Sequence, residues 1–334
     1  MINKIYPWQK SPWTQLQSNR SRLPHALLLH GASGIGKYDF AKHLSQSLLC
    51  RQPDEYGHAC DLCSSCIWFN EEGHPDFRLL TPEQDSEAEQ EDVASKKTKK
   101  KTQISVAQIR ELSDFLGLSS HHSEGVRIIL IHPAESLNIA SANALLKMLE
   151  EPAAGVLFIL VAHQLHRLLP TILSRCQKIN LPAPTALQAQ EWLNEKGLTN
   201  ATQQLAYLDG SPINVFNKQS QFEHFKTVWQ QLALGPRLEP HIAASLLLAE
   251  SAESGITALQ KWLYDVVAIK LTGKVRYHIG HLKALQVLSE KVNLSKLFDL
   301  QKKIVEMRKL ATHPLNHELQ MENLLVEYTK AFKN

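Results

Sequence analysis

The sequence has no long apolar run and few cysteines. No stretch approaches the roughly 18 consecutive apolar residues that a membrane span requires, so no membrane partner is expected. The first residues lack the apolar core of a secretory signal, which predicts a cytoplasmic protein. A net charge of +3 is too mild to argue for nucleic-acid binding by itself. The 334 residues with 43% hydrophobic content instead predict a globular protein of two or three domains.

One segment carries most of a phosphate-binding loop. The pattern G-x-x-x-x-G-K-[S/T] wraps phosphates with backbone N–H groups, places a lysine at the terminal phosphates and binds Mg²⁺ with the final hydroxyl. Here a tyrosine stands at that last position, and its phenol oxygen lies too far from the backbone to replace Ser or Thr. The nucleotide-binding candidates are Gly31, Gly34, Gly36, Lys37 and Tyr38. They either bind phosphate weakly or only preserve a tight strand–helix turn.

Strands and helices alternate around this loop. Short apolar runs predict strands, and apolar residues at helical spacing predict the helices between them. The strands are expected at 25–30, 76–80, 126–131 and 156–161, and the helices at 37–49, 105–118, 138–150 and 168–173. Such alternation is typical of a parallel sheet covered on both faces. We therefore expect an α/β P-loop domain over residues 1–181.

The rest of the chain is expected to be helical. Helical patterns cover 185–217, 221–234, 240–271, 280–312 and 316–332, with breaks near Gly210–Pro212, Gly235–Pro236 and His313–Pro314. We divide this part into a small helical domain at 182–219 and a larger all-helical domain at 220–334. The larger domain serves either oligomerisation or only its own core.

A segment within the first domain lacks the residues to fold. Residues 81–102 are acidic up to Asp92 and then carry a lysine run over 96–101, with Val93 as the only large apolar residue. Such a segment buries too little surface to become ordered, so we interpret it as a disordered surface insertion.

Four of the five cysteines fall within 17 residues. They are Cys50, Cys60, Cys63 and Cys66. Two overlapping C-x₂-C spacings and a fourth thiolate can surround one zinc ion tetrahedrally. With four protein ligands no position stays open for water, so the predicted zinc is structural rather than catalytic.

Hydrolysis by a P-loop enzyme also needs acidic residues at the end of a second strand, to hold Mg²⁺ and polarise water. The natural strand, 126–131, is followed by His132-Pro133, and the nearest acid is Glu135. Together with Tyr38, this predicts a chain that does not hydrolyse ATP with Mg²⁺ in its own site.

Two further charged positions stand out. Ser174-Arg175-Cys176 follows a short helix, and Arg175 either compensates the helix dipole or acts as an arginine finger on a neighbouring subunit. Cys176 is expected to be a small buried residue. Glu150 and Glu151 end a helix where the dipole disfavours negative charge, so they pair either with a partner or with a local Lys or Arg.

The chain resembles bacterial clamp-loader subunits of the AAA+ class. The resemblance rests on Ser141–Pro152 (SANALLKMLEEP), the Ser174-Arg175-Cys176 triplet, the cysteine insertion after the P-loop helix, and Gly73–Phe77 (GHPDF). It implies an AAA+ domain followed by a lid and a collar. Such loaders are five-subunit arcs that open a sliding clamp and close it around primer–template DNA.

Within that family, the lost hydroxyl at Tyr38 and the lost acids at His132-Pro133 resemble the rigid stator subunit. The resemblance implies that the chain is not an enzyme by itself but part of a DNA polymerase holoenzyme, with motor and delta subunits as partners. It implies that Arg175 is given in trans to an adjacent ATP site. Gly210–Asn214, where motor subunits carry a sensor arginine, has none.

Two other functions stay open at this point. The first is an ATP-hydrolysing motor with rearranged metal ligands. The second is a nucleic-acid-binding zinc protein, which is disfavoured because few basic residues lie near the cysteines, Arg51 being the nearest, and the overall charge is modest.

Overall fold

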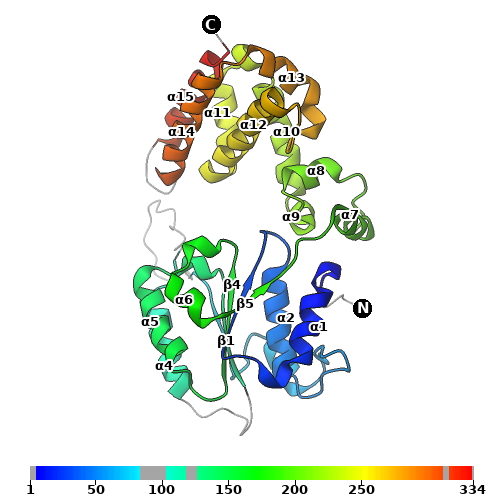
Figure 1. Ribbon diagram of the computed structural model, residues 1–334, viewed down its shortest axis with the longest axis vertical. Coiled ribbons are helices and arrows are strands. Elements are labelled where there is room, and N and C mark those ends of the chain that lie inside the picture. The colour runs from blue at the N-terminus through cyan, green and yellow to red at the C-terminus, as the bar shows by residue number, and fades with distance from the viewer. Residues whose placement is uncertain (1–4, 83–102, 118–125, 311–315, 333–334) are drawn as a thin grey trace, which may run out of the picture. The chain divides into compact units, whose positions relative to one another are not determined.

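The computed structural model describes residues 5–82, 103–117, 126–310 and 316–332. The chain divides into two compact units, Met1–Thr185 and Ala186–Asn334. The first unit contains a sheet of five parallel strands in the order β2-β3-β4-β1-β5 (Figure 1). The predicted parallel α/β architecture is therefore confirmed. None of the described helices is long and apolar enough to cross a membrane.

Four of the five strands coincide with the predicted apolar runs. The strands are β1 Ala26–His30, β2 Phe77–Leu80, β3 Arg127–Ile131, β4 Val156–Ala162 and β5 Gln177–Asn180. β4 lies between β1 and β3 and is buried along its whole length. β5 was not predicted, because only Ile179 of this edge strand is buried and no apolar run marks it.

Helices cover both faces of the sheet (Figure 1). One face packs against α4 Val106–Gly117, α5 Ile139–Glu150 and α6 Pro170–Arg175, and the other against α1 Lys10–Ser18 and α2 Lys37–Leu49. α5 begins at Asn138, whose side chain accepts a hydrogen bond from the Ser141 N–H at 2.8 Å. The insertion predicted at 81–102 lies outside the described residues except for its first two.

The described part of the second unit is helical, as predicted. Its helices are α7 Ala186–Glu195, α8 Thr202–Tyr207, α9 Pro212–Asn217, α10 Gln219–Leu232, α11 Pro240–Leu248, α12 Ala252–Thr272, α13 Leu282–Lys291, α14 Leu294–Leu310 and α15 His317–Lys330. The division of this unit into a lid and a collar stays a prediction. The expected break at His313–Pro314 lies outside the described residues.

Three predicted helical segments are divided in the structure. The segment at 185–217 forms α7, α8 and α9, the one at 240–271 forms α11 and α12, and the one at 280–312 forms α13 and α14. The later breaks fall where a polar side chain caps the next helix. Ser251 accepts from the Ser254 N–H at 3.1 Å, and Asn293 accepts from the Lys296 N–H at 3.2 Å. Capping a new helix satisfies its first amides and offsets the interruption.

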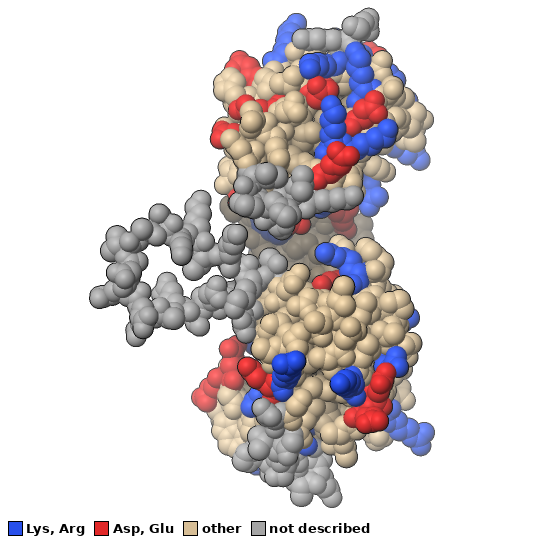
Figure 2. Space-filling model, turned by 90° about the vertical axis from the view of Figure 1, so that its left-hand side faces the viewer, with Lys and Arg blue, Asp and Glu red and all other residues tan. Residues whose placement is uncertain are grey.

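The surface carries charges of both signs close together. Figure 2 shows Lys and Arg side chains among Asp and Glu on one side of the molecule. A groove of about 700 Å³ along α14 and α15 is lined by four lysines and three acids. Within it Lys303 and Lys330 both lie within 3.3 Å of Glu327 carboxylate oxygens. Such mixed charge does not form the one-sign patch that nucleic-acid binding favours.

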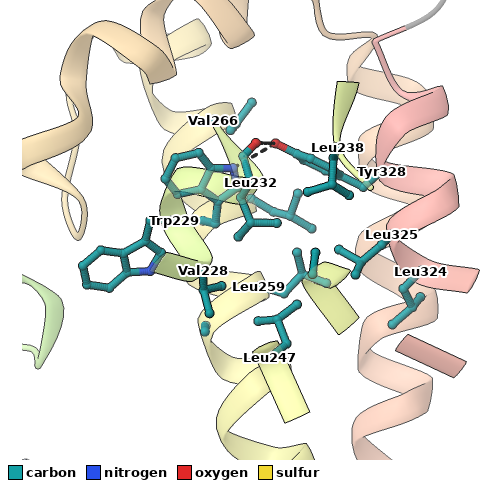
Figure 3. Close-up of a cluster of buried hydrophobic side chains, with 14 of the residues drawn as sticks. Val228, Trp229, Leu232, Leu238, Leu247, Leu259, Val266, Leu324, Leu325 and Tyr328 are labelled. Carbon is teal, nitrogen blue, oxygen red and sulfur yellow. Dashed lines mark hydrogen bonds between the residues drawn. The ribbon is translucent and has the colours of Figure 1, made fainter. Parts of the chain in front are cut away.

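The second unit has an extensive core of its own (Figure 3). Trp262 Nε1 donates to the Tyr328 hydroxyl at 2.9 Å, and that hydroxyl donates to the Leu232 carbonyl at 2.8 Å. These bonds join α10, α12 and α15 while satisfying polar atoms that would be costly to bury unpaired. The buried apolar positions of these helices therefore serve an internal core, the second of the two explanations considered above.

A buried acid holds the segment that follows α12. Asp265 and His278 have no exposed side-chain surface, and the His278 Nδ1 lies 2.8 Å from the Asp265 Oδ2. The same carboxylate accepts backbone N–H bonds from Arg276, Tyr277 and His278, at 2.9, 3.0 and 2.7 Å. Burial lowers the pKa of His278 below its ordinary 6.5. Burial raises the pKa of Asp265, but these hydrogen bonds outweigh it and lower that pKa.

We expect Asp265→Ala to destabilise the protein by about 3–5 kcal/mol, because three N–H groups and the imidazole lose a buried acceptor. For the wild type, stability should fall as the pH drops below about 6.5, because unfolded His278 takes up a proton that the folded ring resists. Asp265 adds a loss of the same sign when the pH falls through its lowered pKa. Urea denaturation followed by circular dichroism at several pH values measures both effects.

Asp299→Ala is the matched control, because Asp299 is exposed and, among the described residues, pairs only with the exposed Lys302. Its effect should stay within about 0.5 kcal/mol. Equal stability of the Asp265 and Asp299 variants would contradict the role given to the buried carboxylate.

Candidate functional site

The glycine loop connects β1 to α2 at the carboxyl end of the sheet. Gly36 is the N-cap of α2, with φ at 79°, in the left-handed region that glycine adopts without strain. A Cβ at Gly31 would lie 2.4 Å from the Leu181 carbonyl oxygen. The first glycine is thus required by close approach of the chain that leaves β5.

Lys37 is folded back on the loop. Its side chain is buried, with the residue only 2% exposed. The ammonium donates to the Gly31 and Ala32 carbonyls at 2.9 and 2.5 Å. Burial lowers the pKa of Lys37 to about 8, although the nearby Glu135 acts in the opposite direction. The lysine therefore satisfies the carbonyls of its own loop.

The segment before α1 packs on the same loop, which sequence reasoning did not anticipate. In the short helix Pro7–Gln9, Trp8 Nε1 donates to the Ile35 carbonyl at 3.0 Å. Gln9 Nε2 donates to the Ile35 and Gly36 carbonyls at 2.8 and 2.9 Å. No local pattern signals these bonds, because they join residues 26 or 27 apart in the chain.

Aromatic rings lie at the two positions where an ATPase would hold Mg²⁺ and where this sequence lacks the ligands. Tyr38 stacks on His132, with ring centroids 4.7 Å apart, and His132 meets His163 edge to face at 5.6 Å. Burial, reinforced by His163, lowers the pKa of His132 to about 4. The His132 ring is therefore neutral at pH 7. Among the described residues, no metal-binding group of three or more ligands occurs here.

Glu135 lies closer to the loop than the sequence suggested. It is near enough for its charge to raise the pKa of Lys37 against burial. However, its Oε1 accepts hydrogen bonds from the backbone N–H groups of His163 and Gln164. This oxygen therefore caps the loop after β4.

Arg175 is the last residue of α6, and its side chain is 33% exposed. Its Nη1 donates to the Thr171 carbonyl at 3.0 Å, the contact expected of a basic residue at a helix end. Its Nη2 lies 2.6 Å from Glu150 Oε1, at the end of α5. Glu150 thus pairs with a local arginine, which is the second of the two explanations given above for the acids at the end of this helix.

The other two residues of the triplet differ in environment. Cys176 is buried in the core on this face of the sheet, and burial raises its pKa to about 11, with Lys178 acting against it. It is the small buried residue that was predicted. Ser174 donates its hydroxyl to the Thr171 carbonyl at 3.0 Å.

The four clustered cysteines come together after α2. Cys50 ends α2, Cys63 caps α3 (Ser64–Asn70), and all four sulfur atoms lie within 4.8 Å of one another. The sulfur atoms of Cys50 and Cys60 lie 3.5 Å apart, those of Cys50 and Cys63 4.0 Å apart, and those of Cys60 and Cys66 3.9 Å apart. A tetrahedral ion with metal–sulfur bonds of about 2.3 Å needs sulfurs about 3.8 Å apart. The cluster therefore fits a metal ion.

Backbone amides favour the thiolate form of Cys60 and Cys63, whereas burial raises the pKa of Cys50 and Cys66. The Cys60 N–H donates to the Cys50 sulfur at 3.3 Å, and the Cys63 N–H to the Cys60 sulfur at 3.3 Å. Burial raises the pKa of Cys63, but backbone N–H donors such as that of Arg51 outweigh it, and the pKa falls to about 6. Deprotonated sulfur is the form that binds metal.

His74 of the Gly73–Phe77 motif connects the segment that carries the four cysteines, residues 50–66, to the start of β2. His74 Nδ1 accepts from the Asp76 N–H at 3.0 Å, which leaves Nε2 to donate to Ser65 Oγ at 2.8 Å. Ser65 in turn donates to the Leu49 carbonyl at 2.7 Å. The motif thus joins α2, α3 and the start of β2.

Comparison with known proteins decides the family. The family model described as DNA polymerase III, delta subunit, matches residues 8–185. DNA polymerase III subunit delta' of Pseudomonas aeruginosa is 34% identical, over 97% of this chain and 97% of that protein. The chain belongs to the DNA polymerase III delta prime family. This confirms the resemblance to clamp-loader subunits carried by residues 141–152 and 174–176.

Other delta prime proteins match over shorter stretches. That of Escherichia coli is 33% identical over 57% of this chain and 53% of its own length. That of Bacillus subtilis is 35% identical over 48% of this chain and 43% of its own length. A solved gamma-subunit-related protein from Thermotoga maritima covers 97% of this chain and 100% of its own at 15% identity, but its TM-score of 0.45 is too low to bear on function.

Proposed function

We propose that this chain is the non-hydrolysing stator of a bacterial clamp loader. In this role it assembles with motor subunits and delta as a hetero-pentamer in the cytoplasm, and the complex loads the sliding clamp onto primer–template DNA during replication. Membership in the delta prime family and the resemblance to clamp-loader subunits support the proposal. The chain thereby serves a DNA polymerase holoenzyme without catalysing nucleotide transfer itself.

The observation that carries the proposal is the stack of Tyr38 on His132. A P-loop ATPase holds Mg²⁺ with a hydroxyl at the position of Tyr38 and with an acid at the position of His132. Here two aromatic rings stand at these positions, and burial keeps the imidazole neutral. A site without these groups supports a subunit that leaves hydrolysis to its neighbours.

Arg175 is the residue we assign to the neighbouring ATP site. It is permanently charged, part of its side chain is exposed, and it ends a helix rather than lying in the core. A guanidinium in this setting can stabilise the charge that develops on a transferred phosphoryl group. Ser174 and Cys176 serve its placement, one at the helix end and one in the core beneath it.

We assign zinc to the four-cysteine cluster. Sulfur separations near 3.8 Å and four thiolates match a closed tetrahedral site, which has no open position for water. Zinc bound there would hold the end of α2 and the start of α3 together.

One observation favours the alternative of a motor subunit. Glu135 lies within electrostatic reach of Lys37, where a motor needs an acid. Its Oε1 accepts two backbone N–H bonds, so the carboxylate is turned towards residues 163 and 164. We therefore rank the motor second.

We expect the isolated chain to show no ATP turnover above background in the presence of Mg²⁺, because a phenol ring and a neutral imidazole stand where a hydroxyl and an acid would hold the metal. A phosphate-release assay on purified chain measures this. Lys37→Ala and Glu135→Gln should leave the background unchanged. Turnover at a motor-like rate that both substitutions abolish would establish the alternative.

In the reconstituted loader, we expect Arg175→Ala to slow hydrolysis at the adjacent ATP site on the order of a thousandfold, the usual worth of an arginine finger. Single-turnover measurement with clamp and primed DNA should then show a slow phase from that one site. Arg167→Ala, which changes another basic residue before α6, is the matched control. An unaltered time course for the Arg175 variant would refute the assignment.

We expect gently purified chain to contain about one zinc ion, and Cys63→Ser to lose most of it and to melt at a lower temperature. Elemental analysis and thermal denaturation measure the two effects. Cys176→Ala should keep the zinc, because this thiol lies in the sheet core. Equal zinc content in both variants, or none in the wild type, would exclude the site.

A further inference from the structure

Glu150 is placed against the preference of its helix. It is the last residue of α5, where the helix dipole disfavours an acid. Its side chain is 49% exposed, so burial does not require this residue. Glu151 follows it and is also exposed. Of the two acids, Glu150 is the one that contacts Arg175, which makes their pairing the feature to explain.

Two contacts from different helices fix the plane of the Arg175 guanidinium. Glu150 Oε1 lies 2.6 Å from Nη2, and the Thr171 carbonyl accepts from Nη1 at 3.0 Å. Ser174 Oγ lies 3.4 Å from the same Nη1. Because the guanidinium is planar and rigid, anchoring both terminal nitrogens sets the direction of the whole group.

We propose that Glu150 is a positioning residue that aims Arg175 at the neighbouring subunit's ATP. This inference rests on the proposed function of Arg175. An exposed ion pair adds little stability, so the pair is better explained by orientation than by stabilisation of the fold. A freely rotating arginine would spread over many rotamers, and few of them would direct its charge at a phosphate outside the subunit.

The contact with Glu150 orients the Arg175 guanidinium and leaves some of its N–H donors available. The ion pair is single, between one carboxylate oxygen and one nitrogen, rather than the two-bond fork that Arg and carboxylate can form. An arginine has five N–H donors, and within the described part of the chain no contact uses the Nε–H. That N–H is available to meet a phosphate.

The test compares variants in the reconstituted loader by single-turnover ATP hydrolysis. We expect Glu150→Ala to slow the phase from the adjacent site about tenfold, less than Arg175→Ala does, because a misaimed group loses part of its effect. The ATP concentration that gives half the maximal rate should not change, since the loss lies in the transition state. Glu150→Gln should restore most of the rate, because its amide oxygen accepts the same bond.

Glu151→Ala is the matched control and should behave like the wild type. The double variant of Glu150 and Arg175 should be no slower than Arg175→Ala alone. A Glu150→Ala loader that is as fast as the wild type, or faster because the acid had restrained the arginine, would overturn the inference while the finger stands. If Arg175→Ala itself has no effect, the proposed function fails and this inference with it.

Discussion

The loop between β1 and α2 keeps its wrapped shape through contacts of its own, and the rest of the nucleotide-type site depends on that constraint. Gly31 lies against the Leu181 carbonyl, where any Cβ would collide. Lys37 supplies a cation to the loop carbonyls, and Gln9 bonds to the carbonyls at its far end. A phosphate would accept from the N–H groups of the loop, whereas these protein donors satisfy its carbonyls and so hold the turn from within.

A loop that is stable without ligand allows the groups around it to change. Tyr38 stacks on His132 beside the loop. Glu135 turns one oxygen to the amides after β4. The same sheet also carries α5 and α6, and their ends bring Glu150 to Arg175. An aromatic stack beside the glycine loop and a partly exposed arginine at the end of α6 are thus compatible with one sheet.

Much of this could be predicted from the sequence, and the failures have physical reasons. Apolar runs revealed β1 to β4, and the glycine spacing revealed the loop. β5 was missed because an edge strand needs only one buried residue, here Ile179. The break between α11 and α12 was missed because apolar spacing continues across Ser251, while its capping bond breaks the helix. The contacts of Trp8, Gln9 and Glu150 join distant segments, and no local pattern encodes such pairs.

Lys37 shows that a motif residue can have a structural role that does not depend on the chemistry typical of the motif. If it served phosphate alone, its ammonium would be exposed and ready in the absence of ligand. It is instead buried, and its ammonium donates to the Gly31 and Ala32 carbonyls, which would lose these donors if the lysine were removed. Burial also lowers its pKa to about 8, so the ammonium stays mostly charged at pH 7. Its contacts therefore give Lys37 a role in folding that requires no nucleotide, and its presence alone is no sign of an ATPase.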